Sequence, residues 1–235
     1  MFSKLVLSTV LLSSAMLVHA DKVTEDLDVK AFKGLELSGA SSVTYIRGEP
    51  QRVTVTIERD YLPRVQAEVS RRGRLELDVH EKGWFGGSAV GDFVVTAPTL
   101  DFIELSGSGS LHGDRLDTDE VRIELNGSGD IRFDEVNGRS VRVELAGSGD
   151  VELNNLTAVT VRAEIMGSGD IKISGAAAKA VVEIIGSGDF DGRELDTEVT
   201  RGEVIGSGDI VVKSAASANF ETIGSGRGKV LKERP

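Results

Sequence analysis

Hydrophobic and polar residues alternate along most of this chain, which predicts β-strands and not helices. Residues 121–125 read Val-Arg-Ile-Glu-Leu, and the same alternation returns at 141–145 and 161–165. Successive side chains of a strand point to opposite faces, so each segment has one apolar face and one charged face. A second apolar pair follows each segment, as in Ile131 and Phe133. No helical period of useful length is found after residue 20, and an all-β fold is therefore predicted.

The alternating segments belong to a repeat of about twenty residues. The tripeptide Gly-Ser-Gly occurs at steps of 20, 20, 20, 19, 20 and 18 residues. Its copies begin at Gly107, Gly127, Gly147, Gly167, Gly186, Gly206 and Gly224, with a degenerate copy at Gly39. A third apolar position recurs at Leu116, Val136, Leu156, Ala176, Leu195 and Ala215. Three apolar patches per repeat predict a roughly triangular coil, and stacked coils bury what one coil cannot. We predict a single-stranded β-helix, or β-solenoid.

Each Gly-Ser-Gly is expected to form a sharp corner, because both glycines can adopt positive φ angles cheaply. Aspartate usually follows, at Asp130, Asp150, Asp170, Asp189 and Asp209. A short carboxylate there can accept hydrogen bonds from the N–H groups of the turn. Calcium binding is the alternative, since turns rich in glycine and aspartate bind Ca²⁺ in nonapeptide β-rolls. The repeat lacks the second turn that such sites need, so the structural interpretation is favoured and no metal or cofactor is predicted.

Residues 21–100 lack the repeat and are expected to form a strand-rich N-terminal cap on a solenoid of residues 101–235. Segments such as 53–57 and 75–79 alternate between apolar and polar residues, with turns between them. We interpret them as antiparallel strands that cover the first coil. An uncovered end of a solenoid is a sheet edge that would recruit other chains.

The first twenty residues are predicted to be a signal peptide that is cleaved after Ala20. Lys4 supplies the positive start, and an apolar run extends from Leu5 to Leu17. This run is too short for a membrane span, and no later segment equals it, so no span is expected in the mature chain. The prediction is an exported protein, periplasmic or extracellular.

Charge and cysteine content limit the partners and the chemistry. The formal net charge is −11 and becomes −12 when Lys4 leaves with the signal peptide. A surface this acidic argues against nucleic acid as a partner. The chain has no cysteine, which excludes disulfides and thiolate metal sites.

A column of glutamates is the first candidate binding surface. Glutamate stands three residues before each Gly-Ser-Gly, at Glu104, Glu124, Glu144, Glu164, Glu183, Glu203 and Glu221. With rungs ~4.8 Å apart, neighbouring carboxylates would repel by about 0.9 kcal/mol in water. Arginines two residues earlier, at Arg122, Arg142, Arg162 and Arg201, offer a structural balance. The functional alternative is a strip that binds cations or another ligand.

A second candidate surface is apolar. The residue before Gly-Ser-Gly changes from Ser106, Asn126 and Ala146 to Met166, Ile185, Ile205 and Ile223. Alternation places this column outward, beside the glutamates. An exposed apolar stripe predicts a surface for a partner or for self-association, unless the C-terminal tail folds over it. Trp84 and Phe85 form an aromatic pair that could contact a partner or cover the end of the stack.

The order of several motifs resembles a known bacterial family. The motifs are Phe-Lys-Gly-Leu-Glu-Leu at 32–37, Val-Thr-Val at 53–55, Leu-Glu-Leu at 75–77, Ala-Pro-Thr-Leu at 97–100, Ile-Glu-Leu-Ser-Gly-Ser-Gly at 103–109 and the Gly-Ser-Gly-Asp copies. Over nearly all of the mature chain they resemble the "putative auto-transporter adhesin, head GIN domain" family. The resemblance implies a right-handed β-helix in an envelope or surface protein and suggests adhesion, and it supplies no catalytic residues.

The predicted function is a secreted binding or scaffold module that contacts an unknown protein or glycan at the cell envelope, without catalysis. The alternative is a polysaccharide-active enzyme of the pectinase kind, because such enzymes group carboxylates on a β-helix. A distorted coil with a cleft of unlike acids would favour the enzyme, whereas a uniform ladder favours the scaffold. The acids of this chain repeat identically from copy to copy, which favours the scaffold.

Overall fold

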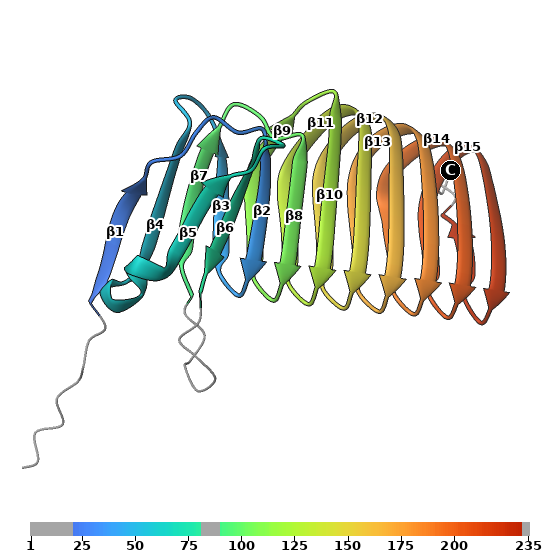
Figure 1. The fold of residues 1–235 in the computed structure, drawn as a ribbon. Coiled ribbons are helices and arrows are strands. Elements are labelled where there is room, and N and C mark those ends of the chain that lie inside the picture. The colour runs from blue at the N-terminus through green and yellow to red at the C-terminus, as the bar shows by residue number, and fades with distance from the viewer. Residues whose placement is uncertain (1–20, 81–89, 232–235) are drawn as a thin grey trace, which may run out of the picture.

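The computed structural model describes residues 21–80 and 90–231, without the side chains of residues 214 and 215. The predicted signal peptide, Trp84 and Phe85 lie outside the described residues. The described chain forms one 16-stranded sheet that winds into an elongated coil, with a short 3-10 helix, η1 (Arg59–Arg64), in the N-terminal region. Figure 1 shows the strands stacked side by side along a single axis.

The repeat residues form parallel strands that pair in register. The strands are β8 (Phe102–Gly107), β9 (Ser110–Asp117), β10 (Glu120–Gly127), β11 (Asp130–Gly147), β12 (Asp150–Gly167), β13 (Ile171–Gly186), β14 (Phe190–Gly206), β15 (Asp209–Gly224) and β16 (Arg227–Val230). Glu124, for example, pairs with Glu104 on one side and with Glu144 on the other. Equivalent residues of successive rungs therefore lie over one another, which confirms the predicted β-solenoid.

The coil is right-handed. In Figure 1 strands such as β8 and β10 descend on the near side, the chain climbs on the far side, and each rung lies further along the axis than the last. A right-handed connection between parallel strands is the hand that the twist of the strands favours.

The corners are held by hydrogen bonds between rungs. At most corners the carbonyl oxygen of the first glycine accepts two of them: the N–H groups of Ser128 and Gly129 both donate to Gly107, at 2.9 and 3.1 Å. The expected positive φ is confirmed for the first glycine of each copy, at +125° to +137°. The expectation is wrong for the second glycine, whose φ angle does not lie in the left-handed region. The second glycine recurs in the repeat for another reason. A Cβ on Gly149 would lie 2.0 Å from the carbonyl oxygen of Gly129, so the rungs approach too closely for any side chain.

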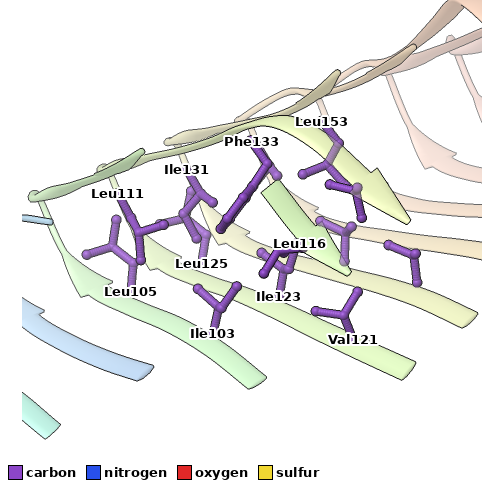
Figure 2. Close-up of a cluster of buried hydrophobic side chains, with 14 of the residues drawn as sticks. Ile103, Leu105, Leu111, Leu116, Val121, Ile123, Leu125, Ile131, Phe133 and Leu153 are labelled. Atoms are coloured by element: carbon purple, nitrogen blue, oxygen red, sulfur yellow. The ribbon is translucent and has the colours of Figure 1, made fainter. Parts of the chain in front are cut away.

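The interior of the coil is filled by the predicted apolar positions (Figure 2). The ring of Phe133 takes the space beside Gly113, where an added Cβ would lie 2.1 Å from a ring atom. On the other side of Gly113 lies Tyr45, whose ring centroid is 6.3 Å from that of Phe133. The Tyr45 hydroxyl donates to the carbonyl of Ala97 at 3.1 Å, and burial raises the pKa of this phenol to about 12. The fully buried tyrosine therefore stays neutral at any physiological pH.

The third apolar position is confirmed at four of its predicted residues, Leu116, Val136, Leu156 and Leu195, which are all buried. The prediction is wrong at Ala176, which is exposed, while Ala177 is buried instead. The pairing of β12 with β13 shifts after Leu153, so that Gly175 takes the place opposite Leu156. This rung has 19 residues, and a fixed offset from Gly-Ser-Gly therefore fails at the position where the residue is missing. The side chain of Ala215 lies outside the described residues.

The N-terminal region contains the predicted antiparallel strands and also extends the stack. β1 (Lys22–Leu27) pairs antiparallel with β4 (Arg52–Glu58), which pairs antiparallel with β7 (Asp92–Ala97), and β5 (Val65–Val69) pairs antiparallel with β6 (Arg74–Val79). However, β2 (Gly34–Gly39) joins β6 to β8 in parallel, and β3 (Ser42–Arg47) joins β7 to β9 in parallel. The interpretation of all these segments as antiparallel was therefore too simple. Alternation identifies a strand but does not give the direction of its neighbour.

We expect replacement of Gly149 by alanine to destabilise the protein by roughly 3 kcal/mol, because the new Cβ would force two rungs apart. Urea unfolding followed by circular dichroism measures the change. Gly48→Ala is the matched control, since its Cβ would meet only a side-chain methyl of Thr96 at 3.2 Å. Equal unfolding midpoints for the two variants would show that the close approach of the rungs is unimportant.

Candidate binding surface

The outward face of the strands that precede the corners carries three columns of side chains. We call this surface, on β8, β10 and the second halves of β11 to β15, the outer face. The glutamate column consists of Glu104, Glu124, Glu144, Glu164, Glu183, Glu203 and Glu221, and the apolar stripe consists of Met166, Ile185, Ile205 and Ile223. On the other side of the glutamates lies the arginine column of Arg122, Arg142, Arg162, Val181, Arg201 and Asn219. Every sequence-predicted site residue except Trp84 and Phe85 therefore lies on one face.

Arginines neutralise the first part of the glutamate column. The Nε of Arg122 lies 2.5 Å from the carboxylate of Glu124 in its own rung, and its Nη2 lies 3.0 Å from Glu144 in the next rung. Arg142 repeats the arrangement with Glu144 and, at 3.1 Å, with Glu164. Each of these guanidinium groups joins two rungs, which supports the structural interpretation of the column here.

The last part of the glutamate column differs. Val181 stands in the arginine column beside Glu183, and Asn219 stands beside Glu221. Within residues 21–80 and 90–231, no ion pair involves Glu183, Glu203 or Glu221. A shallow hollow of about 190 Å³ lies here, lined by Val181, Val182, Glu183, Arg201, Gly202, Glu203, Asn219 and Glu221. These carboxylates are therefore free to meet an external cation.

The apolar stripe points outward, as predicted. Its side chains are exposed by 48% at Met166, 44% at Ile185, 38% at Ile205 and 68% at Ile223. They pair in register from rung to rung, so they form one continuous strip. The alternative was that the C-terminal tail covers them, and the described part of the chain, which ends at residue 231, leaves them open.

The aspartate column after the corners has a structural role, though not the expected one. The carboxylates of Asp150, Asp170, Asp189 and Asp209 accept hydrogen bonds from the next rung instead of from their own turn. Asp150 accepts from the N–H of Asp170 at 3.1 Å, and Asp170 accepts from the N–H of Asp189 at 2.8 Å. Among the described residues no group of three or more His, Cys, Asp or Glu side chains is placed to hold a metal ion.

Two of the further hollows, neither of them predicted, lie within residues 31–160. One, of about 610 Å³, lies at another corner of the coil and is lined by Asp101, Thr118, Asp119, Glu120, Arg139, Ser140, Val159 and Thr160. Its acids come from neighbouring rungs and do not repeat, since Asp119 and Glu120 are followed one rung later by Arg139 and Ser140. That irregularity was the available sequence signal. The other, of about 560 Å³, lies in the cap around Phe32, Pro50 and Pro98, where the Gln51 amide bonds both backbone groups of Phe32.

The model of the family described as "Putative auto-transporter adhesin, head GIN domain" matches residues 31–233. The chain belongs to this family. The predicted resemblance is thereby confirmed over nearly all of the described residues.

Solved structures share the head GIN architecture. A "putative lipid binding protein" from Parabacteroides distasonis superposes with a TM-score of 0.80 at 18% identity, over 90% of this chain and 97% of that chain. A "putative adhesin" from the same species superposes with a TM-score of 0.78 at 21% identity, over 90% of this chain and 98% of that chain. A "putative adhesin" from Bacteroides fragilis superposes with a TM-score of 0.77 at 21% identity, over 91% of this chain and 98% of that chain. At these identities the likeness shows the fold alone. A comparison with curated proteins gives no match.

No helix within the described residues of this head GIN chain is long and apolar enough to cross a membrane.

Within the glutamate column, the pKa of Glu124 is shifted by its surroundings. Burial raises the pKa of Glu124 above its ordinary value of 4.5, and the negative charges of Glu104 and Glu144 raise it further, against the opposing effect of Arg122. Only 18% of its side chain is exposed. A raised pKa in the folded state means that ionisation of this carboxyl opposes folding.

We expect Glu124→Gln to become more stable relative to the wild type as the pH rises. Below the pKa of the unfolded chain Glu124 is protonated in both states, and the amide copies that form. Above the raised folded pKa the wild type carries the unfavourable charge and the variant does not. Thermal midpoints measured at pH 4 and pH 7 check this, and a variant that loses stability between the two, relative to wild type, would contradict it.

Proposed function

We propose that this head GIN protein is an exported, adhesin-like binding module of the cell envelope, with the coil acting as a rigid platform and without catalysis. One observation carries the proposal. A continuous apolar stripe lies exposed beside carboxylates that have no partner among the described residues. Soluble proteins rarely leave such a strip open unless it meets a partner.

Two other features agree with this function. The sequence of residues 1–20 has the pattern of a cleavable signal peptide, which would export residues 21–235 as a cap followed by the solenoid. Structural neighbours of this family carry names that describe adhesins and a lipid-binding protein. We extend the binding role, and not any particular ligand, to this chain.

A polysaccharide-active enzyme is the second candidate, and one observation favours it. Asp101, Asp119 and Glu120 meet at a hollow between neighbouring rungs, where the repeat is irregular. Glycoside hydrolases use a carboxylate pair in which the acid is commonly shielded from water. Here all three acids are exposed, and the cation Arg139 lines the same hollow. The hollow therefore suits a bound sugar better than a reaction.

The mature chain, residues 21–235, is tested on an array of envelope glycans and, in parallel, for release of reducing ends from polysaccharides. We expect no reducing-end release above the buffer blank, because no shielded acid lies in the hollow. Release that disappears in the double variant Asp119→Asn/Glu120→Gln would identify an enzyme and overturn the proposal. Release that persists in the double variant would indicate a contaminating hydrolase.

A further inference from the structure

We infer that the last part of the outer face binds a basic amphipathic helix of a partner polypeptide. The helix would lie along the axis of the coil, with its apolar side on the stripe and its lysines or arginines on Glu183, Glu203 and Glu221. This inference rests on the proposed binding function and names the chemical class of the partner.

The first support is that two changes occur within one rung of each other along the stack. Ion pairs with Arg122 or Arg142 engage the three glutamates of β10 to β12, and the neighbouring column is polar or small at Asn126 and Ala146 before it becomes apolar at Met166. Val181 takes the place of the arginine in β13 and Asn219 takes it in β15, with Arg201 between them in β14, and isoleucine occupies the stripe from β13 onwards. A stabilising ladder has no need for these two changes together, whereas a binding surface needs both.

The second support is the charge of this part of the face. Three carboxylates, Glu183, Glu203 and Glu221, lie there with one guanidinium, that of Arg201, and none of the four forms an ion pair within the described residues. A cationic partner would remove the repulsion between carboxylates on neighbouring rungs. The mature chain carries −12 overall, which would also steer cations towards it.

The third support is the spacing of the rungs. Equivalent side chains of neighbouring rungs lie ~4.8 Å apart, and one turn of an α-helix rises ~5.4 Å. Over the three steps from Met166 to Ile223 the two spacings differ by only about 2 Å, which flexible side chains can absorb. An extended strand along the axis would repeat every ~6.6 Å on one face and would lose register at once. The surface therefore matches a helix better than a strand.

A second copy of this chain is the competing occupant of the stripe. It would bring another net charge of −12 and a second glutamate column to the same interface. Like-charged surfaces in close contact oppose association. A positively charged helix satisfies both the stripe and the glutamates, so we favour it.

The test uses the mature chain and a synthetic peptide of leucine and lysine arranged as an amphipathic helix about four turns long. Fluorescence anisotropy at low salt measures the dissociation constant. We expect saturable binding that weakens about tenfold for Ile185→Asn/Ile205→Asn and, separately, for Glu183→Gln/Glu203→Gln. A peptide of the same composition with its pattern scrambled is expected to bind much more weakly.

The matched control is Glu194→Gln/Glu198→Gln. It removes two exposed acids of β14 that lie outside the outer face. It should bind the peptide as the wild type does. Equal loss in the control and in Glu183→Gln/Glu203→Gln would reveal a general attraction between opposite charges and overturn the inference. Circular dichroism and thermal midpoints identify any variant that fails to fold. The Glu183→Gln/Glu203→Gln pair, which changes one half-buried and one exposed side chain, keeps the inference testable if the isoleucine variant unfolds.

Light scattering decides between the helix and a second copy. A doubled mass that returns to that of the monomer in Ile185→Asn/Ile205→Asn would assign the stripe to self-association and overturn the inference. Absence of saturable peptide binding up to about 1 mM would also overturn it. Neither result by itself overturns the proposed binding function, whereas turnover of a polysaccharide by the mature chain would overturn it.

Discussion

The structure depends on the close approach of successive backbones at the Gly-Ser-Gly corners. One carbonyl oxygen, such as that of Gly107, accepts the N–H groups of Ser128 and Gly129 from the next rung. A Cβ on either glycine would collide with the backbone of the rung before it. The corner thus fixes the register of the whole coil, because a shift of one residue would place a side chain where none fits.

A fixed register turns every position of the repeat into a column, with favourable and unfavourable consequences. Apolar columns pack inside the coil, and Gly113 provides the space that the ring of Phe133 requires. Columns of carboxylates repel, and the protein offsets this in two ways. Arg122 and Arg142 bridge glutamates of neighbouring rungs, while Asp150 and Asp170 accept backbone N–H groups of the next rung. Where neither device is present, as at Glu203, the charge remains available to a partner.

Function in such a fold resides in departures from the repeat, because a uniform ladder offers the same chemistry everywhere. Val181 in the arginine column and the isoleucines of the stripe are one departure. The acids of the hollow around Asp119 are another. Both lie on a backbone that the corners hold rigid, which suits recognition of a partner by shape and charge.

The sequence by itself determined the β-solenoid, its register and the outward direction of the glutamates and the stripe. It could do so because alternation and the glycine corner are local properties that occur in every repeat. It failed at Ala176, where a 19-residue rung displaces the buried position, and it assigned too many strands of the cap as antiparallel. Only the tertiary structure decided which arginine bridges which glutamates and where the hollows form. Those features depend on contacts between side chains of different rungs, and such contacts cannot be predicted from the pattern within one strand.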